Sequence, residues 1–199
     1  LKTFTTNRHA ADVFVVMAMT DREKASHGIS AIIVEKGTPG FRVGKKENKL
    51  GMRCSPTGEL ILTDCRVPAT QMAGERGEGF IDSLKILDGG RISIAALGVG
   101  IAQGAYEAAL KYSKQRKQFG RFISEFQAIQ HKLVDMATRL DAARLLTYRA
   151  ATMLDAGKRV TRESAMAKLF ASETYAKVAN MGMQMMGGYG YNMEFDMQR

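Results

Sequence analysis

The chain has 199 residues, enough for one large domain or two small ones, and its 45% apolar and 25% charged residues are typical of a globular protein. No run approaches the roughly 18 uninterrupted apolar residues of a membrane span, and the two cysteines and three scattered histidines have the spacing of neither a disulfide framework nor a metal site. The formal charge of +9 favours anionic partners, which include nucleic acid, acidic lipid and phosphate-bearing small molecules.

The first 70 or so residues contain short apolar runs of β-forming residues. The chain opens on LKTFTTNRHAADVFVV, without an initiator methionine and within a strand-like segment, so we expect a fragment of a longer protein. Three runs predict strands, ADVFVVMAMT at 11–20, ISAIIVEK at 29–36 and GELILTDCRVP at 58–68. Turn signals separate them and no helix-length pattern intervenes, so we predict antiparallel pairing as far as the link QMAGERGEG at 71–79.

Beyond this link the apolar residues recur at steps of three, four and seven. The spacing predicts three long amphipathic helices, near 78–116, 125–156 and 162–186, that suit an antiparallel bundle. Three helices of this length seldom stand alone, so a fourth is expected outside this sequence. The predicted core face of the first helix comprises Phe80, Leu84, Leu87, Ile94, Leu97, Ile101, Ala105 and Ala108. The predicted fold class is therefore α+β, an antiparallel β part followed by a helical bundle.

The first predicted helix carries five glycines that weaken it. Each glycine in a helix interior costs about 1 kcal/mol relative to alanine, so a structural or functional reason is expected. The motif DGGR at 88–91 exposes backbone between an acidic and a basic side chain, which suits a polar ligand lying across the helix. The other three glycines favour close packing against a neighbouring helix: Gly98, Gly100 and Gly104. They do not form a dinucleotide-binding fingerprint, because the preceding strand and the third glycine of that motif are absent.

The segment KYSKQRKQFGRFISEFQ at 111–127 combines five basic residues with three phenylalanines and admits several interpretations. In the first, the cations stabilise a helix C-terminus, and Ser124 with Gln127 forms a capping box that opens the next helix. In the second, Arg116 directs its guanidinium at a phosphate, with Phe119 as an aromatic neighbour. Nucleic acid is a third candidate, but base-stacking aromatic residues are not interleaved with the positive charge, and we expect none.

The stretch QMMGGYG at 184–190 is either the glycine-capped end of a core helix or a turn shaped to contact a ligand. Methionines at helical spacing are usually core residues, and a glycine at the C′ position ends about a third to a half of helices. A cap needs one glycine, whereas three occur here within four residues. A side-chain-free turn with Gln184 behind it could approach an adenine or a pyrophosphate closely. Both interpretations stay open on spacing alone.

Taken in order, four stretches resemble the acyl-CoA dehydrogenase family over essentially the whole chain, in its short-chain, butyryl-CoA dehydrogenase-like branch. They are KLGMRCSPTGELILTDCRVP, LDGGRISIAALGVGIAQGAYEAALKYSKQRKQFG, SEFQAIQHKLVDMA and QMMGGYGY. The family fold has an N-terminal helical domain, a middle β-domain and a C-terminal four-helix bundle. The resemblance implies that residues 1–72 are the C-terminal part of the middle β-domain and that residues 73–199 are an incomplete C-terminal helical domain.

The resemblance implies an FAD-dependent enzyme that oxidises the Cα–Cβ bond of an acyl-CoA thioester. In this family a glutamate removes the α-proton while the β-hydrogen leaves as a hydride to flavin N5, and an electron-transfer flavoprotein then accepts the electrons. The resemblance further implies a homotetramer without a membrane span, in the cytoplasm of a bacterium or archaeon or in the mitochondrial matrix of a eukaryote.

The resemblance also assigns residues of this chain to the family's binding positions. Those that match contacts beside the isoalloxazine are Phe4, Thr5 and Thr6, of which the first two replace the usual tryptophan and isoleucine. Those that match contacts to the FAD of a neighbouring subunit are Arg116, Phe119 and Gln127. The segment along the adenosine half of the FAD comprises Gln184, Met185, Met186, Gly187 and Gly188. The strip that touches the acyl-CoA comprises Asp88, Gly89, Gly90 and Arg91.

No catalytic base is expected within this sequence. In one branch of the family the base lies two residues after the aspartate of the first bundle helix, where this chain has Gly90. In the branch that includes the short- and medium-chain enzymes the base follows the glycine turn, just beyond Arg199, and neither Glu194 nor Asp196 matches its position. We therefore expect the chain to be inactive alone.

Two alternative functions remain. The unusual FTT segment and the missing base also suit an acyl-CoA oxidase or a desulfinase-like member of the family. The charge of +9 and the basic run Lys111–Arg121 suit a non-catalytic relative that binds DNA.

Overall fold

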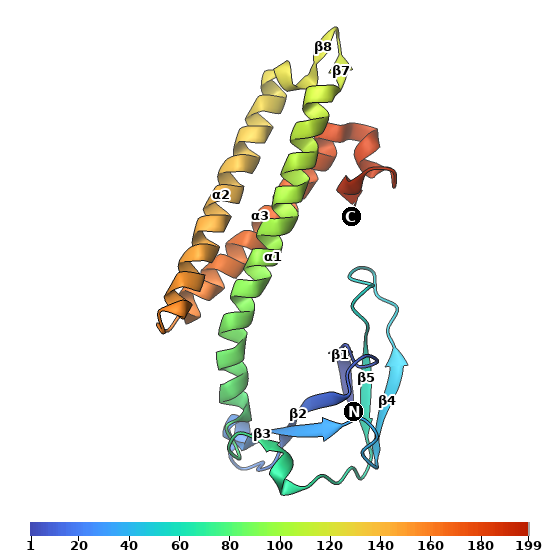
Figure 1. Ribbon diagram of the computed structural model, residues 1–199, viewed down its shortest axis with the longest axis vertical. Coiled ribbons are helices and arrows are strands. Elements are labelled where there is room, and N and C mark those ends of the chain that lie inside the picture. The colour runs from blue at the N-terminus through green and yellow to red at the C-terminus, as the bar shows by residue number, and fades with distance from the viewer. Residues whose placement is uncertain (199) are drawn as a thin grey trace. The chain divides into compact units, whose positions relative to one another are not determined.

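The computed structural model describes residues 1–198 and divides the chain into two compact units, a β unit before Lys85 and a helical unit from Lys85 onward (Figure 1). The strands of the β unit are β1 (Lys2–Thr6), β2 (Val13–Met19), β3 (Ile29–Glu35), β4 (Phe41–Lys46), β5 (Thr57–Leu62) and β6 (Met72–Ala73). Two short 3₁₀ helices, η1 (Ala25–Gly28) and η2 (Ala69–Gln71), connect them.

Both three-stranded sheets of the β unit are antiparallel, which confirms the predicted pairing. One sheet has the order β1-β5-β4 and the other the order β2-β3-β6. The three predicted runs contain β2, β3 and β5. Strand β4 was not predicted, because Gly44 and the two lysines that follow it interrupt the pattern of β-branched and aromatic residues that marks a strand.

The core of the β unit follows from the alternation of side chains along a strand. In β2 the side chains of Phe14 and Val16 are buried, whereas Val13 and Val15 lie exposed on the opposite face. Phe14 packs against Phe41 with ring centroids 5.0 Å apart. The buried cluster comprises Phe14, Val16, Val34, Phe41 and Leu60. These contacts fix which face of each sheet is turned inward.

Arg8, two residues after β1, is the largest fully buried side chain of the described residues. Its three guanidinium nitrogens have no hydrogen-bond partner among the residues that the structure describes. The neighbouring strand accommodates it through Gly58, since a Cβ atom at that position would lie 1.9 Å from Arg8 Nε. A buried charge without a partner loses its hydration and gains no compensating contact, so it lowers the stability of the fold.

Replacement of Arg8 by methionine is therefore expected to stabilise the β unit by about 1–3 kcal/mol, because an apolar side chain of similar length fills the same space without the desolvation penalty. Denaturant unfolding of the wild type and the variant measures the effect. Arg42→Met, at an exposed position of β4, serves as the control and should change stability by less than about 0.5 kcal/mol. A less stable Arg8→Met variant would show that the guanidinium is compensated in solution.

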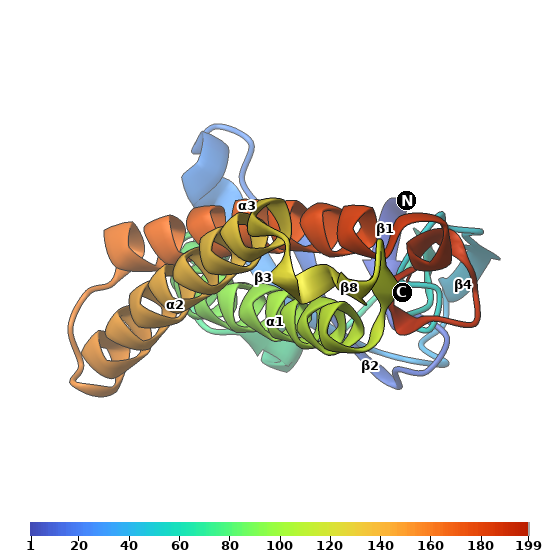
Figure 2. The ribbon, with the colours of Figure 1, turned by 90° about the horizontal axis from the view of Figure 1, so that it is seen from above.

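Three long helices make up the helical unit, α1 (Gly79–Gln115), α2 (Gln127–Asp155) and α3 (Thr161–Met186), and the first turn of α1 still belongs to the β unit. Their ends lie within two residues of the predicted ends. Figures 1 and 2 both show the helices of this unit side by side, with the chain direction reversing from one to the next. The shorter elements are the strands β7 (Lys117–Gln118) and β8 (Arg121–Phe122) and the 3₁₀ helices η3 (Ile123–Glu125), η4 (Gly187–Tyr191) and η5 (Asp196–Gln198).

The predicted core face of α1 is wrong for most of its members. Leu87, Ile94, Leu97 and Ile101 are about half exposed, as are Phe80 and Leu84 to a smaller degree. The buried apolar side chains of this helix are instead Ile92, Ala95, Ala102 and Ala109. Since α1 has apolar residues on more than one face, periodicity finds the helix but not the face that packs. The alanines at seven-residue intervals let α2 and α3 approach α1 closely, and this close approach decides which face of α1 is buried.

The glycines of α1 have different environments. A Cβ atom at Gly98 would lie 3.2 Å from the carbonyl oxygen of Ala171 on α3, which confirms the predicted close packing there. The same prediction is wrong for Gly100 and Gly104, because no described atom lies within 4 Å of a Cβ built at either position. Successive residues of a helix are rotated by about 100°, so these two positions lie off the packed face.

The predicted capping box of Ser124 and Gln127 is also wrong. The N-cap of α2 is Phe126, which makes no side-chain cap hydrogen bond, and Gln127 is the first helical residue. The short turn η3 precedes the helix and shifts its start. The side chain that acts at this turn is Glu125, whose Oε1 accepts a hydrogen bond of 3.1 Å from the backbone N–H of Phe122.

Among the described residues, no helix is both long and apolar enough for a membrane span.

Candidate functional site

A pocket of about 510 Å³ lies in the helical unit, between the end of α1 and the turn after α3. It brings together six of the residues that the sequence assigned to FAD, namely Arg116, Gln184, Met185, Met186, Gly187 and Gly188. Its other lining residues are Tyr112, Gln118, Ile123, Tyr189 and Asn192. The two parts of the lining are about 70 residues apart in the sequence, and the helical packing alone makes them neighbours.

The backbone of Arg116 is held on both sides. Its N–H donates to the carbonyl oxygen of Tyr112 at 2.9 Å, and its own carbonyl oxygen accepts from the N–H of Ile123 at 2.9 Å. Between these two bonds the hairpin of β7 and β8 reverses the chain at Phe119 and Gly120, which both have left-handed backbone angles, with φ of 54° and 80°. The hairpin therefore fixes the direction in which the Arg116 side chain leaves the end of α1.

The electrostatics of the pocket favour an anion. The helical unit carries 17 basic and 10 acidic residues, so most of the chain's positive charge lies there. Four of its arginines pair with carboxylates, Arg91, Arg139, Arg144 and Arg162. Arg116 has no carboxylate partner among the described residues, and its guanidinium lies over the ring of Tyr189 at 5.5 Å from the centroid. Its charge is available to a ligand in the pocket.

The presence of glycine at each of the three glycine positions of QMMGGYG has a different physical explanation. Gly187 ends α3 with a left-handed φ of 59°, and its N–H bonds to the carbonyl oxygen of Gln184, so the predicted glycine cap is confirmed. Gly190 is packed, because a Cβ there would lie 2.7 Å from the carbonyl oxygen of Met183. Gly188 needs neither explanation: its φ is not left-handed, and no described atom lies within 4 Å of a Cβ built on it. A ligand that approaches the backbone would explain this glycine.

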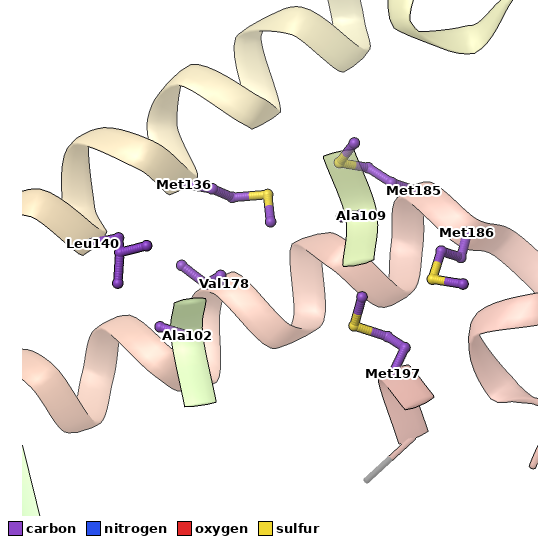
Figure 3. Close-up of a cluster of buried hydrophobic side chains, with 8 residues drawn as sticks. All are labelled: Ala102, Ala109, Met136, Leu140, Val178, Met185, Met186 and Met197. Carbon is purple, nitrogen blue, oxygen red and sulfur yellow. The ribbon is translucent and has the colours of Figure 1, made fainter. Parts of the chain in front are cut away.

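Met185 and Met186 belong to the core more than to the pocket surface. Each is only 6% exposed, and Figure 3 shows them in a cluster that joins all three helices. The other members of this cluster are Ala102, Ala109, Met136, Leu140, Val178 and Met197. The methionines therefore hold the glycine turn in place at the end of α3, and the turn presents backbone to the pocket.

The structure places Phe119 and Gln127 outside the pocket lining. Phe119 is 93% exposed at the tip of the hairpin and makes an edge-on contact with Phe126, with ring centroids 6.3 Å apart. Gln127 is exposed at the first turn of α2. Both project from the surface of this copy of the chain, as the resemblance implies for residues that contact the FAD of a neighbouring subunit.

The FTT segment belongs to β1 in the β unit. Thr5 and Thr6 pair with Gly58 and Thr57 of β5, and the register is interrupted between Lys2 and Thr5. At this interruption Phe4 has a left-handed φ of 54° and is 74% exposed. A non-glycine residue in this conformation is strained by about 1–2 kcal/mol.

The DGGR strip on α1 is held by hydrogen bonds at its acidic end. Asp88 Oδ1 accepts from Arg91 Nη1 at 2.6 Å, and Asp88 Oδ2 accepts from Thr161 Oγ1 at 2.6 Å. The carboxylate thus fixes the guanidinium of Arg91 and ties α1 to the first residue of α3. No described atom lies within 4 Å of a Cβ built on Gly89 or Gly90, so the backbone between the two charges is open. The contact surface of this strip is the glycine backbone and the outer edge of Arg91.

The start of α3 adds a second fixed charge near this strip. Hydrogen bonds from Arg162 to Glu163 Oε1, at 3.0 and 2.7 Å, hold the pKa of the Glu163 carboxyl below its usual value. Glu163 therefore stays ionised at neutral pH and acts as a partner of Arg162.

Among residues 1–198, no group of three or more histidine, cysteine or acidic side chains is arranged to hold a metal ion.

Comparison with known proteins identifies the chain. The family profile of the acyl-CoA dehydrogenase middle domain matches residues 1–65, and that of the C-terminal domain matches residues 77–199. The short-chain specific acyl-CoA dehydrogenase of Megasphaera elsdenii is 48% identical over 198 residues, which cover 100% of this chain and 52% of that protein. The chain belongs to the acyl-CoA dehydrogenase family.

Solved structures agree with this assignment. The structure of butyryl-CoA dehydrogenase from Megasphaera elsdenii matches the whole chain with a TM-score of 0.96 at 48% identity, and the match covers 52% of that chain. A structure described as the electron transferring flavoprotein of Acidaminococcus fermentans matches equally well, with a TM-score of 0.96 and 52% identity, over 100% of this chain and 52% of that one. The chain thus spans about half the length of the relatives it matches.

Family membership confirms the predicted fold class and the predicted cofactor. The antiparallel β part followed by three long helices is the middle-to-C-terminal part of the acyl-CoA dehydrogenase fold, and the family consists of flavin-dependent oxidoreductases that use FAD. The pocket at the end of α1 fits a phosphate-bearing group of that cofactor on two counts. Arg116 lacks a carboxylate partner among the described residues, and Gly188 leaves open space beside it.

Five residues of the pocket lining were not predicted from the sequence, although two signals could have found two of them. Tyr112 lies four residues before Arg116, so both share a face at the end of α1. Tyr189 stands inside the glycine turn that was already singled out. Gln118, Ile123 and Asn192 carry no pattern of their own, and only the fold brings them to the pocket.

Proposed function

We propose that the chain is part of an FAD-dependent acyl-CoA dehydrogenase of the short-chain type, which removes a proton from Cα and a hydride from Cβ of an acyl-CoA thioester. The observation that carries the cofactor part is the pocket that is lined both by Arg116, without a carboxylate partner among the described residues, and by the open backbone at Gly188. When bound, FAD supplies the hydride acceptor, and the protein supplies orientation and electrostatics. The similarity to a short-chain specific dehydrogenase supports the substrate class.

The residues of the pocket have distinct roles in this proposal. The guanidinium of Arg116 binds a phosphate of the cofactor in a charge-assisted contact. The backbone of the turn at Gly187 and Gly188, with Gln184, lies along the adenosine half, and the buried side chains of Met185 and Met186 keep that turn in place. The FAD that Arg116 contacts is that of a neighbouring copy, which Phe119 and Gln127 also reach, and Phe4, Thr5 and Thr6 lie beside the isoalloxazine.

The DGGR strip is the proposed contact for the acyl-CoA. Both oxygens of Asp88 already accept hydrogen bonds, so this residue orients Arg91, and the contacts to the thioester come from Arg91 and from the backbone at Gly89 and Gly90. Gly90 has no side chain that could remove a proton. We propose that the base of this branch follows the glycine turn in the longer polypeptide and that the 199-residue chain alone is inactive.

The proposed assembly and setting follow from the same similarity. We propose a homotetramer with an electron-transfer flavoprotein as its electron acceptor, in the bacterial or archaeal cytoplasm or the mitochondrial matrix. Residues 1–72 are proposed as the C-terminal part of the middle domain and residues 73–199 as part of the helical domain. No nucleic acid partner is proposed.

The test of this function uses the polypeptide in which this chain occurs, purified and compared with the 199-residue chain. We expect the longer protein to be yellow, with a flavin spectrum, and to reduce a dye when butyryl-CoA is added. Faster reduction of oxygen than of the dye would favour an oxidase. A colourless protein that binds DNA in a salt-dependent manner would overturn the proposal.

Replacement of Gly188 by alanine is expected to weaken FAD binding about 5- to 100-fold, because the new methyl group occupies space that the ligand needs, at a cost of about 1–3 kcal/mol. Folding should be unaffected, since no described atom lies within 4 Å of that methyl group. The matched control is Gly100→Ala in α1, which adds the same methyl group in open space far from the pocket lining and should stabilise the helix by about 1 kcal/mol. Equal FAD affinity of the two variants would contradict the assignment of the turn.

A further inference from the structure

Three aromatic rings join the end of α1 to the segment after α3. The ring centroid of Tyr189 lies 6.4 Å from that of Tyr112 and 5.2 Å from that of Phe195, and the centroids of Tyr112 and Phe195 are also 6.4 Å apart. Centroid separations of this size are typical of favourable aromatic pairs. Tyr112 belongs to α1, whereas Tyr189 lies within the glycine turn and Phe195 follows it, so this cluster fixes the orientation of the Tyr189 ring beside the pocket.

The Arg116 guanidinium lies over the face of this fixed ring, 5.5 Å from its centroid. Two neighbouring cations also lie over rings, Lys117 over Phe122 at 4.6 Å and Arg121 over Phe126 at 4.2 Å. Those two pairs belong to the hairpin region, and neither of their cations lines the pocket. Tyr189 is thus the aromatic partner of the one cation in this group that does line it.

An aromatic partner and a carboxylate partner have different consequences for an arginine. A carboxylate neutralises the charge and occupies two of the N–H donors along the edge of the guanidinium. A ring face contacts the plane of the guanidinium and leaves the edge donors free. A guanidinium held in this way keeps its charge and its two-point geometry for a phosphate, and it loses little rotational freedom when the phosphate binds.

We propose that Tyr189 is a positioning residue, which holds the guanidinium of Arg116 in the orientation that binds a phosphate group in the pocket. The proposal rests on the proposed function, which supplies the diphosphate of FAD as the ligand. Tyr189 acts through Arg116 and through no contact of its own with the phosphate. Its loss therefore matters only for ligands that carry phosphate and only while Arg116 is present.

The test is a double-mutant cycle with ADP and adenosine as probes, measured by calorimetric titration of the 199-residue chain. The variants are Tyr189→Leu, Tyr189→Phe, Arg116→Ala and the double variant Tyr189→Leu with Arg116→Ala. We expect Tyr189→Leu to weaken ADP binding about 2- to 5-fold, the factor that corresponds to a cation–π contact at an exposed site. Adenosine binding should be unchanged, Tyr189→Phe should bind ADP like the wild type, and Tyr189→Leu should have no further effect once Arg116 is alanine.

The cycle separates the positioning role from a structural one and from failure of the proposed function. The inference is overturned if Tyr189→Leu weakens the binding of ADP and of adenosine equally, or if it weakens ADP binding equally with and without Arg116. In either case Tyr189 only supports the turn, and the phosphate site itself stands. If the wild type binds ADP no better than adenosine, the pocket has no phosphate site, and both the inference and the proposed function of Arg116 are overturned. Circular dichroism of each variant shows whether the leucine substitution perturbs the helices, and Tyr189→Phe keeps the ring if it does.

Discussion

Replacement of Arg116 by alanine is expected to weaken FAD binding by about 10- to 150-fold. The substitution removes a guanidinium that has no carboxylate partner among the described residues, and with it a charge-assisted contact worth about 1.5–3 kcal/mol. The flavin content of the purified protein and a fluorescence titration of FAD measure the loss. The affinity of the variant should also depend less on salt than that of the wild type, because one phosphate contact is gone.

Two further variants separate the geometry of Arg116 from its charge. Lys114→Ala removes one positive charge from the same exposed end of α1, outside the pocket lining, and should change FAD affinity less than about twofold. Arg116→Lys keeps the charge but not the planar fork, so its affinity should lie between those of the wild type and Arg116→Ala. Unchanged flavin content in Arg116→Ala would show that the basic run only stabilises the end of the helix.

Replacement of Met136 by alanine is expected to lower the free energy of unfolding of the helical unit by about 2–5 kcal/mol. Met136 is fully buried on α2, and Figure 3 shows its side chain in the cluster where α1, α2 and α3 meet. Its removal leaves a cavity that the backbones of three packed helices cannot close. Denaturant unfolding followed by circular dichroism measures the change.

Val134→Ala is the matched control for this prediction. Val134 lies two residues away on the same helix and is 64% exposed, so its truncation should change the free energy of unfolding by no more than about 0.5 kcal/mol. Met136→Leu conserves most of the volume and should cost less than about 1.5 kcal/mol. If Met136→Ala were as stable as Val134→Ala, the cluster would not form in solution as the structure shows it.

Local sequence patterns were sufficient for the three long helices, for strands β2, β3 and β5, and for several features of the site. The helix ends were predicted to within two residues, because the 3.6-residue period persists over many turns and each helix has a clear end signal. A glycine cap was one of the two interpretations that the sequence left open for QMMGGYG, and the positive φ of Gly187 at the end of α3 confirms it. The antiparallel strands followed from the absence of crossover helices.

The strand β4 and the start of α2 were beyond these patterns. In β4, Gly44 and charged residues dilute the strand signal, and the strand forms because β5 supplies its hydrogen-bond partners. At the start of α2, the turn η3 displaced the helix from the predicted capping box. In both cases a neighbouring segment outweighed the local preference.

The sequence by itself determined that this chain would form an antiparallel β part and three long helices, because hydrogen bonding and side-chain periodicity act over a few neighbouring residues. Tertiary structure alone decided which face of α1 is buried, since its apolar residues cover more than one face and the close approach of α2 and α3 selects the small ones. It also decided that Arg116 meets Tyr189, 73 residues further along the chain.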